Sequence, residues 1–243
     1  MRKILKRIIH KIELKRALKS SDKFIAYLRK QGITIGSNCW FQKPETITID
    51  NTRPLLVEIG KNCRFLQNFT LLTHDGTAKV FGPIWHEFLP SSGRVKIGNN
   101  VYFARNCSVL KGVSIGDNCI IGYGSTVLHD IPSNSVAVGT PAKVVCTIEE
   151  YYKKRKKQSL EEAFTLARLI FEKTGKRPTI EQMYEEFPFW MDGDQEDERL
   201  RFTVQYQTRG YYDKYRIEHK APFKSFDSFI DVALGVTKDK VLY

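Results

Sequence analysis

Large apolar residues recur at every sixth position along two stretches of this 243-residue chain. A short motif marks the spacing at four places: IGSN at 35–38, IGKN at 59–62, IGNN at 97–100 and IGDN at 115–118. The first pair of motifs is 24 residues apart and the second pair 18, and both are multiples of six. A period of six fits neither an α-helix nor an alternating strand. It predicts a coil of three short flat faces, each pointing one aliphatic side chain inward.

Counting by six gives the expected inward anchors. From Ile35 they are Phe41, Ile47, Arg53, Ile59, Phe65 and Leu71, and from Ile97 they are Phe103, Val109, Ile115, Ile121 and Val127. Only Arg53 is polar. The next residue is often small, as at Gly36, Gly60, Gly98, Ala104, Gly116 and Gly122. Small residues are expected at tight corners, where a Cβ would be strained.

Four of the five cysteines share one slot, four residues after an anchor: Cys39, Cys63, Cys107 and Cys119. A free cysteine behaves as a small buried hydrophobe, and buried structural thiols are usually inert. The slot therefore predicts packing. The chain has no CxxC pair, so neither a disulfide framework nor a zinc site is indicated.

The segment VSIGDNCIIGYGSTVLHDIPSNSVAVGTPAKVV, residues 113–145, resembles the closing part of the left-handed β-helix, hexapeptide-repeat acyltransferases. The resemblance covers roughly residues 31–148 and is nearest to sugar O-acetyltransferases of the maltose and galactoside type and of surface-polysaccharide synthesis. It implies a mainly β fold, a left-handed parallel β-helix. The handedness comes from the family alone, because most parallel crossovers are right-handed.

The regular spacing breaks at LLTHDG, residues 71–76. The next anchors would be Thr77 and Pro83, and Ile59 to Ile97 is 38 residues, two more than two coils of 18. A loop of about twenty residues, about 74–95, is therefore expected to leave the coil. Loops this long are usually functional or disordered, and the aromatic residues in this one favour order.

In the resembling family the catalytic histidine stands at the base of this loop in a TH dipeptide, which His74 matches. A histidine suits a general base because its pKa lies near neutrality. Either Asp75 or Glu87 is expected to orient the imidazole, and Glu87 joins His74 as a catalytic candidate. A backbone N–H near Ala104 would hold the oxyanion. Acceptor-binding side chains are expected at Asp75, Trp85, His86 and Tyr102.

The family binds acetyl-CoA in a groove between two prisms of a homotrimer. By position, the groove would use Ala104, Arg105, Gly122, Tyr123, Gly124, Leu128, His129, Thr140 and Lys143. Three of these depart from the frequent family residues: Tyr123, Leu128 and His129. The phosphate end would then depend more on Lys143 and the basic run 153–157, since lysine can act as a point cation beside a phosphate.

The expected activity is acetyl-CoA-dependent O-acetylation of a sugar hydroxyl by direct transfer, in surface or capsular polysaccharide synthesis. N-acetylation of an amino sugar or other amine, and a non-catalytic trimeric scaffold, stay open as alternatives. No metal is expected, because zinc enzymes of this fold need closely spaced histidines along the coil, which this chain lacks. No nucleic-acid partner is expected either, because the basic residues lie outside any RNA- or DNA-binding motif.

The two ends differ from the repeats. Residues 1–30 hold eleven Lys or Arg against Glu13 and Asp22 and predict a basic amphipathic helix. This helix either docks on the open end of the coil or contacts an anionic membrane that carries a lipid-linked acceptor. With no signal peptide and no apolar run of spanning length, a cytoplasmic location is expected, with the membrane alternative placing the protein at the inner face.

Residues 149–243 predict an accessory module of mixed, partly helical structure and unknown role. Helices are expected at 159–175, with a capping box at Ser159 and Glu162, and at 179–187 and 225–235. No catalytic motif is recognised there.

Overall fold

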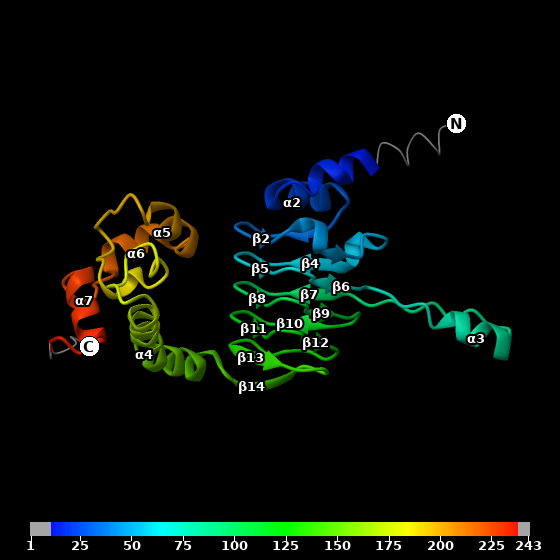
Figure 1. The fold of residues 1–243 in the computed structure, drawn as a ribbon. Coiled ribbons are helices and arrows are strands. Elements are labelled where there is room, and N and C mark those ends of the chain that lie inside the picture. The colour runs from blue at the N-terminus through cyan, green and yellow to red at the C-terminus, as the bar shows by residue number, and fades with distance from the viewer. Residues whose placement is uncertain (1–10, 238–243) are drawn as a thin grey trace. The chain divides into compact units, whose positions relative to one another are not determined.

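The structure is a computed structural model that describes residues 11–237. The chain divides into two units, Met1–Tyr151 and Tyr152–Tyr243, each with a hydrophobic core of its own. Short parallel strands stack into three sheets in the first unit (Figure 1). The chain visits the three sheets in turn, so the first unit is a parallel β-helix, as the period of six predicts.

The strands follow in three sets. The first sheet holds β1 (Thr34–Ile35), β4 (Val57–Ile59), β7 (Val95–Ile97) and β10 (Ser114–Ile115). The second holds β2 (Trp40–Phe41), β5 (Arg64–Phe65), β8 (Tyr102–Phe103), β11 (Ile120–Ile121), β13 (Ser135–Val138) and the antiparallel β14 (Lys143–Thr147). The third holds β3 (Thr48–Ile49), β6 (Thr70–Leu71), β9 (Ser108–Val109) and β12 (Thr126–Val127).

The first coil departs from the strict spacing. Ile49, rather than Ile47, pairs with Leu71. The short 3₁₀ turn η1 (Pro44–Thr46) lies between β2 and β3, and a second turn, η2 (Pro54–Leu56), lies between β3 and β4. These insertions explain the polar exception, because Arg53 caps η2 instead of pointing inward.

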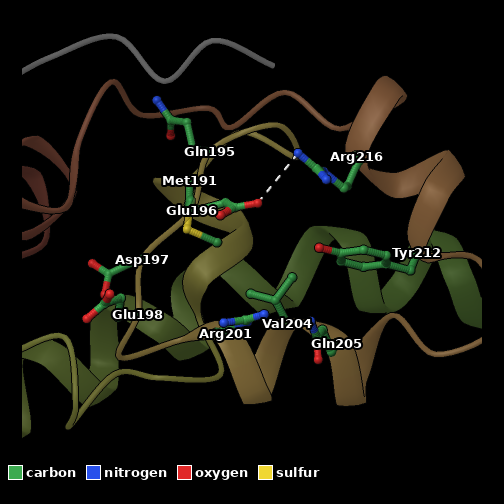
Figure 2. Close-up of a pocket in the computed structure, with 10 residues that line it drawn as sticks. All are labelled: Met191, Gln195, Glu196, Asp197, Glu198, Arg201, Val204, Gln205, Tyr212 and Arg216. Atoms are coloured by element: carbon green, nitrogen blue, oxygen red, sulfur yellow. Dashed lines mark ion pairs between the residues drawn. The ribbon is translucent and has the colours of Figure 1, made fainter.

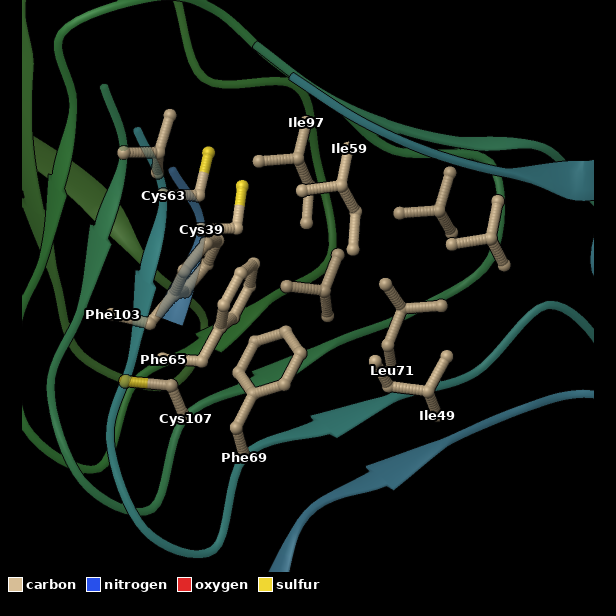
Figure 3. Packing of buried hydrophobic residues seen from close by; sticks show 14 of the residues in the cluster. Cys39, Ile49, Ile59, Cys63, Phe65, Phe69, Leu71, Ile97, Phe103 and Cys107 are labelled. Carbon is tan, nitrogen blue, oxygen red and sulfur yellow. The ribbon is translucent and has the colours of Figure 1, made fainter. Parts of the chain in front are cut away.

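Aromatic stacking fills the coil beneath the second sheet (Figure 3). Phe65 stacks face to face on Phe41 and Phe103, with ring centroids 4.5 and 5.1 Å apart. The four cysteines of the shared slot are all buried, and each Sγ donates to a carbonyl of an adjacent turn. The prediction that these cysteines pack the core is confirmed.

The corner glycines are required by close packing between coils. A Cβ on Gly60 would lie 2.5 Å from the carbonyl oxygen of Gly98, and a Cβ on Gly98 would lie 2.7 Å from the carbonyl carbon of Gly116. None of these three glycines has a positive φ. The left-handed conformation falls instead on nearby asparagines, which adopt it more readily than other side chains; Asn100 and Asn118 are two of them, and their side chains hydrogen-bond across coils at 3.0 Å.

The described part of residues 1–30 covers the first coil as two helical segments rather than one helix. Residues 11–17 are helical, and α2 (Ser21–Lys30) follows after a break. Phe24 packs edge-on against Phe41 with centroids 5.4 Å apart. The Arg29 guanidinium donates to the backbone carbonyls of Ile35 and Gly36, which the first coil leaves without a strand above them. Residues 11–30 therefore contain an end cap; residues 1–10 lie outside the described residues.

The second unit is helical. Its core gathers around Phe229, which contacts Phe164, Phe189 and Trp190. Its elements include most of α4 (Ile148–Thr174), then η3 (Phe187–Phe189), α5 (Arg201–Gln207), α6 (Tyr212–Glu218) and α7 (Phe226–Ala233). The helical part of the expected module is confirmed. The described residues of this unit form no strand, so "mainly β" holds only for the first unit.

Of the three helices predicted in this unit, one is confirmed, one is confirmed only at its end and one does not form. Ser159 lies inside α4, so no capping box starts a helix there, although the end before Gly175 is confirmed. Residues 179–187 form turns rather than a helix. The helix at 225–235 is confirmed as α7, with a capping box of Ser225 and Ser228. Among residues 11–237, no helix is long and apolar enough to cross a membrane.

Candidate active site

His74 and Asp50 meet at the corner between the third and first sheets. Asp50 directly follows β3 and His74 comes soon after β6, the strand paired with β3 on the next coil. His74 Nδ1 lies 2.5 Å from Asp50 Oδ2. The histidine side chain is 36% exposed, whereas the Asp50 side chain is only 4% exposed. A buried carboxylate thus holds one edge of an accessible imidazole.

Asp50 is kept ionised by its hydrogen bonds. Its Oδ1 accepts from the Thr52 amide at 3.0 Å and the Thr52 hydroxyl at 2.6 Å, and its Oδ2 accepts from the Thr73 amide and hydroxyl. Burial alone would raise the pKa of Asp50, but the bonds from Thr52, Thr73 and His74 outweigh burial and hold the pKa well below its usual range. A carboxylate can only accept, so His74 Nδ1 carries the proton and Nε2 is left to take one.

Asp75 fastens the neck of the loop instead of touching the imidazole. Its carboxylate accepts from the Thr77 hydroxyl at 2.6 Å and the Ser91 hydroxyl at 2.9 Å, and it pairs with Lys111 Nζ at 2.5 Å. Lys111 first, and then these hydrogen bonds, hold the pKa of Asp75 well below its usual range. An antiparallel bridge between His74 and Ser92 closes the neck.

The rest of the loop forms an arm that leaves the stack between β6 and β7 (Figure 1). It carries α3 (Ala78–Trp85), which has no buried residue; Trp85 is 63% exposed. His86 caps this helix in the left-handed conformation, and Glu87 makes no hydrogen bond or ion pair with any described residue.

The expected orienting group is therefore corrected: Asp50, rather than Asp75 or Glu87, holds His74. The sequence contained a signal for it. Once the residues inserted around Pro44 are counted, Ile49 becomes the anchor that pairs with Leu71. Asp50 then falls beside the turn that carries His74.

The residues expected to bind acetyl-CoA lie at two different corners. Ala104 and Arg105 follow β8, and residues 122–124 follow β11, at the corner between the second and third sheets. The Gly124 amide donates to the Arg105 carbonyl at 3.0 Å, which joins these two coils. Leu128 and His129 instead follow β12, at the corner that His74 occupies. One chain alone does not bring all the expected residues together.

The corner between the second and third sheets offers groups that suit a phosphorylated thioester carrier. Arg105 and Lys143 are exposed cations, and Tyr123 is 71% exposed and accepts at its hydroxyl from Asn106. Thr140 lies beside them, donating to the Gly124 carbonyl at 3.2 Å. These residues fit acetyl-CoA, with Lys143 as a cation for its phosphates, Tyr123 as an aromatic surface for its pantetheine arm and Arg105 at the thioester end.

The backbone N–H expected near Ala104 for the oxyanion corresponds to the amide of Arg105, because that of Ala104 itself is already bonded. The Ala104 amide donates to the Ile121 carbonyl at 2.9 Å, so it already takes part in the hydrogen bonds between neighbouring coils. The next amide, that of Arg105, makes no hydrogen bond with any described residue and is available to a developing charge. Tyr102, expected to wall the acceptor, lies on β8 and is 39% exposed. Over residues 11–237, no group of three or more His, Cys, Asp or Glu side chains could hold a metal ion.

Comparison with known proteins gives a consistent assignment. Residues 94–129 match the family model "Bacterial transferase hexapeptide (six repeats)". Protein CapG of Staphylococcus aureus is 35% identical over 124 residues, covering 51% of this chain and 71% of CapG. Galactoside O-acetyltransferase of Escherichia coli (strain K12) is 30% identical over 163 residues, covering 57% of this chain and 77% of the enzyme. A solved galactoside acetyltransferase in complex with coenzyme A is 26% identical over 61% of this chain and 83% of its own, with a TM-score of 0.41.

Proposed function

Because the chain belongs to the hexapeptide-repeat acetyltransferases and is an acetyltransferase of the galactoside O-acetyltransferase type, we propose that it acetylates a saccharide hydroxyl. The acetyl donor is acetyl-CoA, in keeping with the coenzyme A complex of a relative. The observation that carries the proposal is the Asp50–His74 pair at the base of the loop. The proposal includes a left-handed winding of the coil, as in the family.

In this proposal His74 is the general base. A sugar hydroxyl is hardly ionised at neutral pH, so its attack on a thioester needs a group that removes the proton as the new bond forms. Nε2 takes that proton while Asp50, hydrogen-bonded to Nδ1–H, stabilises the imidazolium that results. The acceptor oxygen bonds to the acetyl carbon, the carbon–sulfur bond breaks, and the thiolate leaves and recovers a proton.

The Arg105 amide is the proposed oxyanion donor, since preorganised N–H groups stabilise charge that develops during acyl transfer. Transfer is direct, without an acetylated cysteine. Cys39, Cys63, Cys107 and Cys119 are buried, and burial raises the pKa of Cys107 and Cys119, which disfavours the reactive thiolate.

The proposed assembly is a homotrimer whose sites form between protomers. His74 and Arg105 lie at different corners, with the third sheet between them. A head-to-tail ring would bring the His74 corner of one protomer against the Arg105 corner of the next, because heterologous interfaces close into rings. The apolar side chains of α3 and the following turn, exposed in the single chain, offer surface for such a contact; they are Val80, Ile84, Trp85 and Phe88.

The proposed setting is synthesis of a surface or capsular polysaccharide, in the cytoplasm at the inner membrane face. The exposed cations of the helical cap are the physical support, because each basic residue near an anionic surface contributes about 1 kcal/mol. In residues 11–19 these are Lys11, Lys15, Arg16 and Lys19, while Leu14 and Leu18 of the same segment pack against the core. Three copies in a trimer would add their weak contacts.

The test is turnover of acetyl-CoA by the purified protein against a panel of free, nucleotide-linked and lipid-linked saccharides. Free thiol is followed continuously, and the product is analysed by mass spectrometry before and after mild alkali. Alkali removes an O-acetyl ester and leaves an N-acetyl amide, so the amine alternative is separated in the same assay. Absence of transfer to every saccharide and amine acceptor would favour the scaffold alternative.

A further inference from the structure

The helical unit contains a pocket of about 360 Å³ between the acidic loop after Met191 and the helices α5 and α6 (Figure 2). Each helix contributes two polar side chains four residues apart, a spacing that places them on one face. These are Arg201 and Gln205 on α5, and Tyr212 and Arg216 on α6. The pocket volume falls within the range of small-ligand sites, about 300–1,000 Å³.

Several polar groups of this pocket are uncommitted. Three side chains make no hydrogen bond or ion pair with any described residue: those of Arg201, Gln205 and Glu198. The Tyr212 hydroxyl makes no hydrogen bond with a described residue either. The other charges are already matched. Glu196 pairs with Arg216 at 3.6 Å, as the dashed line in Figure 2 marks, and Asp197 binds the nearby Arg199 at 2.6 Å.

This balance of charge argues for an uncharged ligand. The carboxylates of the loop would repel a phosphate or a carboxylate, and Arg201 would repel an amine. What is left is a guanidinium that only donates, a carboxylate that only accepts, and an amide and a phenol that do both. Vicinal hydroxyls, each both donor and acceptor, satisfy such a mixed set.

An aromatic pair stands on the same helix. Phe202 and Tyr206 on α5 stack with centroids 6.0 Å apart and planes 15° apart, and Phe202 is 79% exposed. Neither ring lines the pocket; both lie on the face of α5 next to the one that carries Arg201 and Gln205. A flat ring can cover the C–H face of a pyranose, so this pair suits the sugar unit next to the one whose hydroxyls the pocket binds.

We propose that this pocket is a second saccharide site, which holds a neutral sugar unit of the acceptor away from the position that is acetylated. The proposal rests on the proposed function for its biological meaning, but the binding it predicts is separate from catalysis. It gives the helical unit the role of retaining an oligomeric acceptor.

The binding test uses the full-length protein and short neutral oligosaccharides of glucose, galactose and mannose, followed by saturation-transfer NMR and calorimetry. Combining Arg201→Ala with Gln205→Ala should weaken binding about tenfold or more, since each lost hydrogen bond contributes about 1 kcal/mol. Lys214→Ala, an exposed cation on α6 outside the pocket, should leave binding unchanged. Phe202→Ala should also weaken binding, while Ile217→Ala, equally exposed at 79%, should not.

Inorganic phosphate and spermidine serve as the charged probes. The proposal is overturned if the wild type binds none of the oligosaccharides, if the double variant binds them as well as the wild type does, or if only a charged probe binds at this pocket.

Kinetics supplies the second readout. The double variant should raise the KM for an oligosaccharide acceptor about tenfold and leave kcat and the KM for a monosaccharide unchanged. An equal effect on both acceptors would contradict a site that acts away from the chemistry. If no saccharide is acetylated at all, the proposed function fails, while the binding titrations still decide the pocket.

Discussion

Asp50 Oδ2 lies 2.5 Å from His74 Nδ1, and 24 residues of chain separate the two. Asp50→Asn should lower kcat by about 10²–10⁴, the usual worth of a general base, because an amide that donates to Nδ1 would leave the proton on Nε2. The affinity for CoA, measured by calorimetry, should not change.

Asp75→Asn is the matched control, one residue from His74 but bound to Lys111, Thr77 and Ser91. It should retain kcat within a few fold if the loop neck stays closed. Equal losses in the two variants would remove the special role of Asp50.

Asp50 should also make stability depend on pH. Its folded-state pKa lies below the unfolded value, so the folded state favours the ionised form. This contribution is fully present above about pH 4, the unfolded pKa, and is lost as the pH falls through the folded pKa. The melting temperature of the wild type minus that of Asp50→Asn should therefore shrink between about pH 5 and pH 2. A constant difference across that range would show that the carboxylate is not preferentially ionised in the folded protein.

The coil was predictable because an inward residue at every sixth position has few other solutions. The first coil was harder to place, since η1 and η2 interrupt the spacing on either side of β3, and the count by six gives Ile47 and Arg53 where the structure pairs Ile49 with Leu71. Pro44 and Pro54 begin these turns, and these prolines are the sequence signal that the regular spacing is interrupted here. The count by six does not include Ile49, so it gives no reason to place Asp50 beside His74 and leaves only the loop carboxylates as candidates.

The helix boundaries of the second unit could not be predicted from local sequence patterns. Its boundaries depend on packing around Phe229 rather than on local signals. Ser159 and Glu162 have the sequence of a capping box, yet α4 runs through them because the helix already begins at Ile148. Contacts of this kind are set by residues far apart in the chain, which no local pattern reports.

Close packing between coils predicts a steric effect at one corner. Gly98→Ala would place a Cβ 2.7 Å from the Gly116 backbone, and overpacking of this kind costs about 1–3 kcal/mol. Gly76→Ala is the control, since its Cβ would meet nothing within 4 Å and its φ is not positive. Thermal unfolding should show a lower melting temperature for Gly98→Ala alone; equal melting temperatures would contradict the packing explanation of the corner glycines.

A site shared between protomers predicts complementation. His74→Ala disables one corner, and Arg105→Glu with Lys143→Glu disables the other by reversing the two exposed cations of the proposed acetyl-CoA site. Each variant alone should be nearly inactive. Co-expressed in equal amounts, the two should regain roughly a quarter of the wild-type rate, because in a head-to-tail ring one junction in four then joins two intact corners.

Sedimentation should show trimers for the wild type and both variants. No recovery in mixed trimers would place the whole site within one chain, and a stable monomer with full activity would rule out the shared site.

The most direct measurement is single-turnover acetyl transfer to a saccharide acceptor by the wild type and by His74→Ala, with the product identified by mass spectrometry. We expect the wild type to form an alkali-labile acetyl ester with no acetylated enzyme, and the variant to be slower by about 10²–10⁴ with unchanged affinity for CoA. Transfer by His74→Ala at the wild-type rate, or an acetylated cysteine on the pathway, would contradict direct transfer with His74 as the base.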